Sequence, residues 1–242
     1  MSSANPKPAI GDSASPAALT GPEQDWLSAE LADGLHALAQ PLTILRSAIG
    51  MLALSKEEDA SRQRFLDLSV RQIDRTCALF ESVQDLVALQ VEPASQLPVD
   101  LQALFLRIVE EQAPAYQAAG VELVANSADF QPRISADPQR TEKAIAASLA
   151  TALSISARGD RIEMNVTRSG DSIEVVIAGS RGRGRTMNSS ERLNLAVAKA
   201  NILSQQSRYH FAEEPFCVTL ALPVCKVDAH TEEKFSAAYA SK

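Results

Sequence analysis

The residue of this chain best suited to chemistry is His36, which opens the run His36-Ala-Leu-Ala-Gln-Pro-Leu-Thr43 and stands five residues before Pro41. An imidazole nitrogen that is exposed on a rigid helix can attack a phosphorus atom held by a partner and then carry the phosphoryl group. The next residue is Ala37, which cannot take a proton and so cannot serve as a general base. His36 is therefore a candidate nucleophile, with a merely solvated helical side chain as the plainer interpretation.

Other candidate groups point to less specific chemistry. The glycine-rich loop at 180–185 carries arginines that could bind a phosphate or an acidic partner, although loop arginines are more often simply solvated. His210 and His230 stand apart from other metal-ligating residues, so no metal site is predicted. The three cysteines lack metal-ligand spacing and are expected to be small buried hydrophobes: Cys77, Cys217 and Cys225.

The positions around His36 follow the pattern of a long helix that needs a helical partner. From Leu31 onward, apolar residues recur at alternating steps of four and three, the a/d spacing of a coiled-coil seam. They are Leu31, Leu35, Leu38, Leu42, Leu45, Ile49 and Leu52. His36 follows Leu35 by one residue, so we expect it outside the seam, toward solvent or a docking partner.

A second helix with nearly the same spacing follows a polar turn at 55–59. Its seam residues are Leu66, Val70, Ile73, Cys77, Phe80, Val83 and Val87. The two helices predict an antiparallel hairpin over residues 25–91, with Trp26 as an anchor at its end. Because two helices leave much of an apolar seam exposed, we expect a second copy to complete a four-helix bundle. Packing of the seam on the C-terminal domain is the alternative.

A domain boundary is expected after the hairpin. Residues 92–99 contain two prolines and break the helical pattern, which predicts a linker before a second domain at 100–225. Asp100 can cap the first helix of that domain. Asp137 and Pro138 can open a second helix, because the missing N–H of proline costs nothing at a helix start.

The remaining pattern alternates helices and strands. Helices are expected at 101–117, 137–156 and 189–206, and strands at 121–125, 161–167, 172–178 and 216–223. The predicted fold class is α+β, a two-helix hairpin followed by an α/β sandwich. Residues 1–24 are too poor in large apolar side chains to offset ordering entropy and are expected to form a disordered tail, and 226–242 a polar tail.

Composition limits the classes of partner. A net charge of -7 and an isoelectric point near 5.1 argue against nucleic acid or an anionic membrane, because either would repel most of the surface. The N-terminal stretch lacks the pattern of a secretory signal, and no run of about 18 apolar residues follows. We therefore expect a cytoplasmic protein whose partner is another protein or a small ligand.

The run from His36 to Thr43 resembles the phospho-acceptor box of sensor histidine kinases, in which a histidine precedes a Pro-Leu-Thr-like stretch by five residues. The order of hairpin, linker and α/β domain is also the order of that family. Residues 100–223 resemble the family's ATP-binding domain, and Asp137-Pro-Gln-Arg140 with the helix that follows is similar to its asparagine-bearing helix.

The same resemblance implies that the nucleotide-handling residues are lost. Where the family holds Mg²⁺ with two asparagines, this chain has Ala147, which has no side-chain oxygen, and Thr151, a poor substitute for a carboxamide. Ser180 replaces the aspartate that accepts from adenine, and Arg192 and Asn194 replace glycines of the ATP lid. The degenerate nucleotide site comprises Ala147, Thr151, Ser180, Gly182, Gly184, Arg192 and Asn194.

A chain that keeps His36 while its ATP site decays resembles the dimeric histidine phosphotransferases, which shuttle a phosphoryl group between response-regulator aspartates without nucleotide. The resemblance implies response-regulator receivers as partners, an upstream hybrid kinase as a further candidate, no cofactor on this chain, and Mg²⁺ on the receiver. Candidate docking residues are Ala37, Ala39, Gln40, Thr43 and Ile44. Two alternatives stay open, a sensor histidine kinase with an atypical ATP site and a non-catalytic adaptor.

Overall fold

The computed structural model describes residues 21–54, 60–126, 133–179 and 187–225. The turn at 55–59, the arginine loop at 180–185, His230 and most of the two predicted tails lie outside the described residues. The first helix begins at Gly21, four residues before the predicted start of the hairpin at residue 25. A proline at its second residue suits a first helical turn, because the backbone of proline has no N–H that would need a partner.

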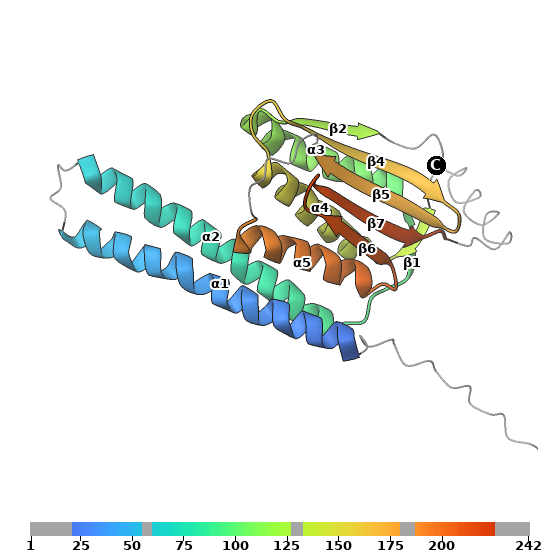
Figure 1. The fold of residues 1–242 in the computed structure, drawn as a ribbon, viewed down its shortest axis with the longest axis horizontal. Helices are drawn as coiled ribbons and strands as arrows, with labels where there is room; N and C mark the ends of the chain where they lie inside the picture. Colours follow the sequence, from blue (N-terminus) through green and yellow to red (C-terminus); the bar gives the residue numbers. More distant parts are fainter. Residues whose placement is uncertain (1–20, 55–59, 127–132, 180–186, 226–242) are drawn as a thin grey trace, which may run out of the picture.

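Helices α1 (Gly21–Leu54) and α2 (Ala60–Val91) form the predicted antiparallel hairpin, which lies alongside a separate α/β unit (Figure 1). Pro41 does not break α1, although proline removes one helical hydrogen bond. Two hydroxyls near it donate back to helical carbonyls, Thr43 to Ala39 at 2.8 Å and Ser47 to Thr43 at 3.0 Å. The helix that carries His36 is therefore continuous on both sides of it.

The predicted seam of α1 divides into two faces. Leu31, Leu38, Leu45 and Leu52 are half-buried in the hairpin, whereas Leu35, Leu42 and Ile49 are exposed. On α2 the predicted seam lies almost wholly on the exposed face, and only Val83 of that set is buried. Helix α2 packs inward through Leu79, Val83, Leu86 and Leu89, of which only Val83 belongs to the predicted seam. The sequence periodicity thus identified apolar faces of both helices, and most of the face that it identified on α2 is exposed rather than packed within the described residues.

One set of exposed apolar side chains repeats every seven residues on both helices. We call it the exposed stripe, and its members are Leu35, Leu42, Ile49, Leu66, Ile73, Phe80 and Val87. Each of the seven is between 42% and 59% exposed. A heptad repeat of large apolar residues is typical of a helical surface that packs against other helices.

By length and composition alone, Asp25–Leu54 of α1 is apolar enough to cross a membrane, contrary to the expectation that no such stretch occurs. A bundle helix can have the same composition, because it buries one face on its hairpin partner and a second on another chain. Asp33, His36, Gln40 and Arg46 interrupt the apolar surface of this helix and are exposed.

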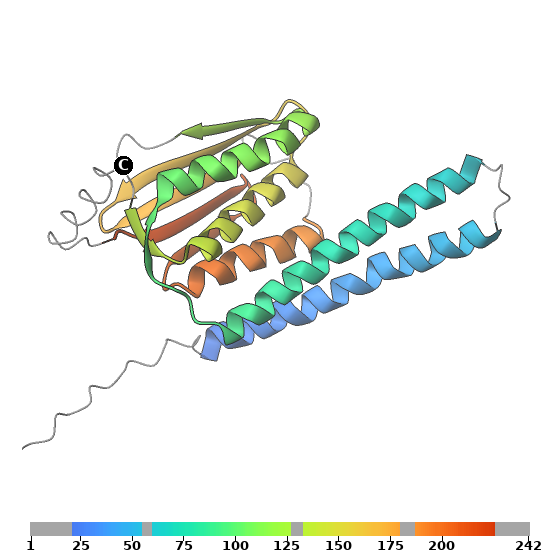
Figure 2. The ribbon, with the colours of Figure 1, turned by 180° about the vertical axis from the view of Figure 1, so that it is seen from behind.

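The second unit is the predicted α/β sandwich. Its sheet has five strands in the order β2-β4-β5-β7-β6, with β2 and β4 parallel and the other pairs antiparallel. The strands are β2 (Glu122–Asn126), β4 (Arg161–Ser169), β5 (Ser172–Gly179), β6 (Arg208–Ala212) and β7 (Cys217–Pro223). Helices α3 (Leu101–Ala119), α4 (Pro138–Ile155) and α5 (Ser189–Leu203) cover one face of this sheet (Figure 2).

The predicted helix signals are confirmed. Asp100 accepts from the backbone N–H of the second and third residues after it, and Asp137 does the same for α4. Gly120 ends α3 in the left-handed conformation, with φ of 69°. The buried core between helices and sheet includes Phe105, Tyr116, Ile145, Leu149 and Met164.

Several short elements escaped sequence analysis. A small antiparallel sheet pairs β1 (Leu97–Asp100) with β3 (Arg133–Ala136), so part of the predicted linker is a strand. The edge strand β6 was also missed. The expectation that all three cysteines are buried is wrong, because Cys77 is exposed and Cys217 and Cys225 are half-buried. Cys77 lies on the outer face of α2, and the other two lie at the ends of β7.

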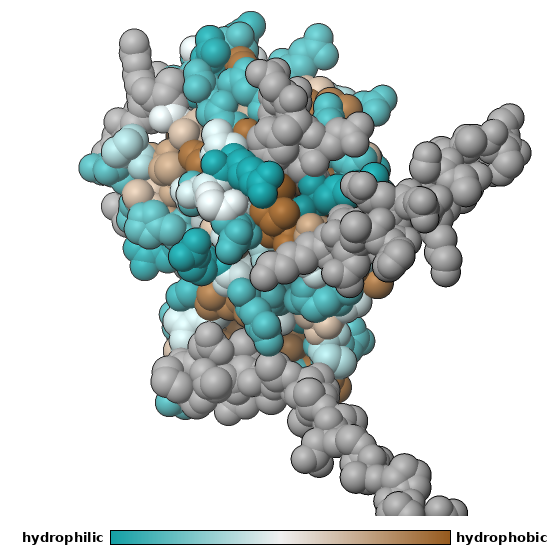
Figure 3. Space-filling view, turned by 90° about the vertical axis from the view of Figure 1, so that its right-hand side faces the viewer, coloured by the Kyte–Doolittle hydropathy of each residue, from teal (hydrophilic) through white to brown (hydrophobic). Residues whose placement is uncertain are grey.

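Viewed from the end at which α1 begins, the described surface of the sandwich shows hydrophilic residues with apolar residues among them, and apolar residues also show below it where the narrower hairpin starts (Figure 3).

Candidate functional site

His36 lies near the middle of α1 and is exposed, as predicted. Its imidazole forms no hydrogen bond or ion pair with any residue that the structure describes. The lone pair of the neutral ring is therefore available to an incoming electrophile. An uncommitted imidazole on a continuous helix meets the requirement for nucleophilic attack on phosphorus.

A cleft of about 1000 Å³ lies between α1 and the sandwich, and His36 is one of its lining residues. Lining residues next to His36 on α1 are Ala37, Ala39 and Gln40, and those from the sandwich include Ser189, Arg192, Lys199 and His210. His210, which stood apart in the sequence, thus shares the cleft with His36. The described residues contain no cluster of three metal-ligating side chains.

The candidate docking residues occupy different environments. Ala39, Gln40 and Thr43 are exposed, as a docking surface requires. Ala37 and Ile44, predicted to be exposed, are half-buried, and Ala37 packs against the cluster that joins the hairpin to α5. The accessible surface beside His36 is thus narrower and more polar than expected, because α5 covers the side of α1 on which Ala37 lies.

Helix α5 docks on the base of the hairpin through a second hydrophobic cluster. Its buried members are Leu27, Leu79, Val83, Leu86, Leu89, Leu193, Val197 and Ala200. Gly34 allows the close approach, because a Cβ placed there would lie 3.0 Å from Val83 Cγ2 and 3.1 Å from Leu193 Cδ1. We predicted a homodimer, with packing of the seam on the C-terminal domain as the alternative. The structure packs one face of the hairpin on α5, and the residues of the exposed stripe are not covered by any described residue.

Charged and aromatic side chains lie together at the base of this contact. The Lys199 ammonium lies 3.9 Å from the centroid of the Trp26 ring, a cation–π contact, and the Trp26 side chain donates to the Glu30 carboxylate. Burial raises the pKa of Glu30 above its ordinary value and Asp33 adds to the rise, while Lys199, Trp26 and Arg192 oppose it. Trp26 is thus the predicted anchor of the hairpin end, and its partner is α5.

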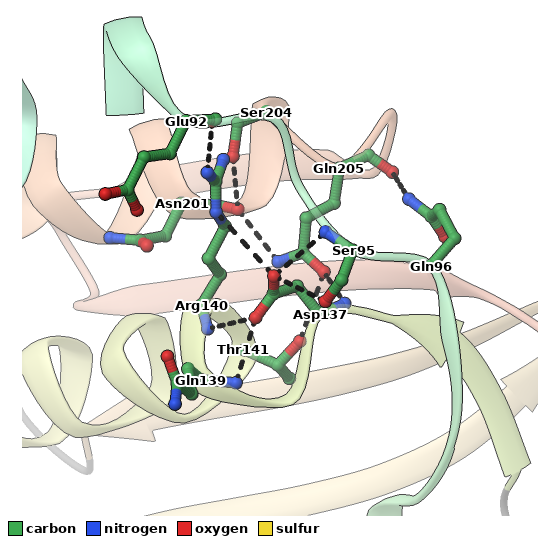
Figure 4. A network of polar contacts seen from close by, with 10 residues as sticks. All are labelled: Glu92, Ser95, Gln96, Asp137, Gln139, Arg140, Thr141, Asn201, Ser204 and Gln205. Atoms are coloured by element: carbon green, nitrogen blue, oxygen red, sulfur yellow. Dashed lines mark hydrogen bonds and ion pairs between the residues drawn. The ribbon is translucent and has the colours of Figure 1, made fainter. Parts of the chain in front are cut away.

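The linker between hairpin and sandwich is held by a polar network (Figure 4). The backbone N–H and the hydroxyl of Ser95 both donate to one oxygen of Asp137, at 3.0 and 2.7 Å. Arg140 lies 3.9 Å from the same carboxylate oxygen and donates to the backbone oxygen of Glu92. One carboxylate therefore caps α4 and fastens the linker.

Gln205, only 1% exposed, extends the network to the end of α5. Its side-chain oxygen accepts from the backbone N–H of Asp137 at 2.6 Å, and its amide donates to the backbone oxygen of Asn201 at 2.8 Å. Gln96 of the linker donates to the Gln205 backbone oxygen at 3.2 Å. Because the linker bonds to both α4 and α5, the hairpin and the sandwich are joined at fixed positions.

The degenerate nucleotide positions on α4 are occupied by the protein itself. Ala147 packs against the hydrophobic core, and the buried Thr151 hydroxyl donates to the Ala147 backbone oxygen at 2.9 Å. At the N-terminus of α5, where the resemblance places ATP phosphates, Asn188 and Glu191 form a capping box. Glu191 is 4% exposed and also accepts from Ser154 at 3.0 Å.

These residues do not fit Mg²⁺-ATP. The buried Glu191 carboxylate at the helix N-terminus repels phosphate. The backbone N–H groups that phosphate would need already donate, that of Asn188 to Glu191 and those of Ser190 and Glu191 to the Asn188 side chain. Arg192 is exposed and Asn194 half-buried, so neither reproduces a glycine's open backbone. Ser180, Gly182 and Gly184 lie outside the described residues, and Glu191 was missed by sequence analysis although its three-residue spacing from Asn188 is a capping-box signal.

No protein-family model and no curated protein matches this sequence. Among solved structures, the chain is similar to the Acinetobacter baumannii histidine kinase AdeS, with a TM-score of 0.60, 17% identity, and coverage of 80% of this chain and 98% of that one. The chain has the histidine-kinase fold. It is also similar to histidine kinase ThkA, solved in complex with response regulator protein TrrA, with a TM-score of 0.66, 12% identity, and coverage of 84% and 63%.

Only part of this site could be predicted from the sequence. The position of His36 on an exposed helical face followed from local spacing. The cleft did not, because α5 and β6 reach it from more than 150 residues further along the chain.

Proposed function

We propose that this chain is a histidine phosphotransfer protein of two-component signalling that works as a homodimer. His36 accepts a phosphoryl group from the aspartyl phosphate of one receiver domain and passes it to the aspartate of another. An upstream hybrid kinase is a candidate source of the first phosphoryl group. No ATP is used, and the receivers supply Mg²⁺ and their own acidic pockets.

The chemistry assigned to the chain is limited to one nucleophile. A lone pair of the neutral imidazole forms the N–P bond while the aspartyl P–O bond breaks, and the receiver carboxylate leaves with the bonding pair. The reverse transfer follows the same path. A general base on this chain is unnecessary, because the attacking nitrogen carries no proton, which agrees with alanine at position 37.

One observation carries the proposal. His36 is exposed beside an open cleft and forms no hydrogen bond with the described part of the chain, whereas the N-terminus of α5 is capped by the buried Glu191 carboxylate. The first feature suits transfer from a protein partner, and the second opposes transfer from ATP. The histidine-kinase fold supports two-component signalling as the setting.

The exposed stripe supports the homodimer. Its residues recur every seven positions on both helices, which is the register that a second hairpin would need to complete a four-helix bundle. A dimer would also cover the apolar surface of α1 without a membrane. We place the protein in the cytoplasm, where it would meet receiver domains.

The decisive experiment offers the purified protein two phosphoryl donors, radiolabelled ATP with Mg²⁺ and a panel of labelled phospho-receivers. We expect acid-labile label on the chain only from receivers, and none on His36→Ala. His210→Ala is the matched control, because it removes an imidazole from the same cleft and should leave labelling unchanged.

Each other outcome selects a different function. Label acquired from ATP would identify a sensor histidine kinase with an atypical ATP site. A tight receiver complex without any label would identify a non-catalytic adaptor. Label that persists in His36→Ala would refute the assignment of His36.

A further inference from the structure

The first turn of α5 lies at the level of His36. Leu193 sits against Gly34 of α1, and Gly34 also faces Val83 of α2. Arg75 of α2, eight residues before Val83 and thus nearer the hairpin tip, donates to the Ser190 hydroxyl at 3.2 Å. Because α1 runs toward the tip, residues between Ser190 and Leu193 lie beside the turn of α1 that follows Gly34.

Arg192 therefore stands beside the stretch of α1 that carries His36. Both residues line the same cleft, and both are exposed. Arg192 forms no hydrogen bond or ion pair with any described residue. Lys199, a second cation of this cleft, is instead held over the Trp26 ring. Two groups without a hydrogen bond to any described residue thus line one cleft, the Arg192 guanidinium, which interacts electrostatically with Glu30, and the His36 imidazole.

We infer that Arg192 binds the phosphoryl group while it resides on His36. This inference rests on the proposed function and assigns that site a second residue. A phosphoryl group is anionic and offers several acceptor oxygens, and a guanidinium can donate two parallel N–H bonds to such a group. The carboxylates of the cleft, Glu30, Asp33 and Glu213, lack this capacity and repel an anion.

The helix N-terminus itself cannot take this role. Backbone N–H groups at the start of a helix commonly bind phosphate, but Asn188 accepts from those of Ser190 and Glu191. The positive group that remains available on this turn is the Arg192 side chain. Arginine at a position where the family resemblance expects glycine therefore has a use of its own in this fold.

The test loads His36 chemically, so that it does not depend on a receiver. Phosphoramidate transfers its phosphoryl group to an imidazole nitrogen as its P–N bond breaks and ammonia leaves. We expect Arg192→Gln to slow loading of His36 by phosphoramidate about tenfold, because the variant loses the charge-assisted hydrogen bonds to the transferred group. Phospho-receivers should show the same loss, and Arg192→Lys should restore part of both rates.

The control is Arg168→Gln, which removes an exposed arginine from the end of β4 and should change neither rate. An unchanged melting temperature in Arg192→Gln would show that the fold is intact. Equal loading of wild type and Arg192→Gln would overturn the inference, as would a loss confined to receivers, which would make Arg192 a docking residue.

The two proposals fail separately. If receivers load His36 of the wild type and Arg192→Gln alike, the phosphotransfer function stands and the role of Arg192 falls. If phosphoramidate loading depends on Arg192 but no receiver ever labels the wild type, the role of Arg192 stands and the phosphotransfer function falls. If phosphoramidate does not load the wild type, the inference is wrong, because the cleft then does not admit a phosphoryl donor.

Discussion

On α1, the His36 imidazole is exposed, forms no hydrogen bond with a described residue and faces an open cleft. At the start of α5, the Glu191 carboxylate is buried and bound by the Asn188 backbone and the Ser154 hydroxyl. The imidazole on the hairpin is accessible to a partner, whereas the polar groups at the start of α5 bond to one another and stabilise the fold of the sandwich.

The largest effect should come from a charge on the exposed stripe. Phe80→Glu would place one carboxylate from each copy in the apolar interface, and we expect the dimer dissociation constant to rise at least about 100-fold. Light scattering after gel filtration measures the change in mass. Arg71→Glu, an exposed charge reversal on α2 outside the stripe, is the control and should leave the mass unchanged. A Phe80→Glu dimer of unchanged affinity would show that the stripe is not the interface.

Parting the hairpin from the sandwich should have the next largest effect. Gly34→Leu cannot fit between Val83 and Leu193, and we expect a loss of about 1–3 kcal/mol together with undocking of α5. Trp26 emission should shift to the red as its contact with α5 opens, and amide exchange in α5 should quicken. Gly50→Leu is the matched control, because no atom lies within 4 Å of a Cβ there. Similar shifts in both variants would argue against docking.

The linker network predicts an intermediate effect that depends on pH. Asp137→Ala should cost about 1 kcal/mol for the lost cap and about 1 kcal/mol more for the bonds from Ser95. Asp100→Ala, which removes a cap without linker contacts, should cost about 1 kcal/mol only. Chemical unfolding of both variants separates the two contributions. Equal losses would mean that the linker bonds contribute nothing to stability.

The sign of the pH dependence follows from the pKa of Asp137. Burial alone would raise that pKa, but the bonds from Ser95 and the backbone and charge of Arg140 lower it below its ordinary value of 3.8. The contribution of the carboxylate is therefore fully present above about pH 5 and is lost as the pH falls through the folded-state pKa. The difference between wild type and Asp137→Ala should shrink in that acidic range.

The smallest effect concerns Glu30, whose pKa is raised mainly by burial. A raised carboxyl pKa means that the folded state disfavours the charged form. The resulting loss of folding stability is absent below the ordinary pKa of 4.5 and appears as the pH rises through the folded-state pKa. Glu30→Gln should therefore raise the melting temperature slightly at pH 7.5 and not at pH 4. A lower melting temperature at pH 7.5 would show that the contacts with Lys199 and Trp26 outweigh the cost of burial.

Local signals were sufficient for much of the fold. Asp100 and Asp137 act through backbone groups within a few residues of themselves, which is why their roles could be predicted. The strands β1, β3 and β6 have only four or five residues each, and β1 and β3 pair with each other across α3 and β2. Their sequences carry too few alternating positions to identify them.

The site was harder to predict, because its two halves come from opposite ends of the chain. The spacing of His36 and Pro41 led to the prediction that His36 is the nucleophile. Nothing local to Arg192 indicates that α5 lies against α1, since that contact depends on Gly34, Leu193 and the fixed linker. The period of the seam could not specify which apolar face of α2 meets its own chain, because both faces carry large apolar residues.

The tips of α1 and α2 project past the sandwich in both views of the ribbon (Figures 1 and 2). The length of this outer segment can therefore change without altering the contact between the hairpin and the sandwich. Removing one heptad from each helix would shorten it by about 10 Å and preserve the angular position of every remaining stripe residue. Family members or engineered variants could thus differ in reach by whole heptads while the nucleophile and its surroundings stay the same.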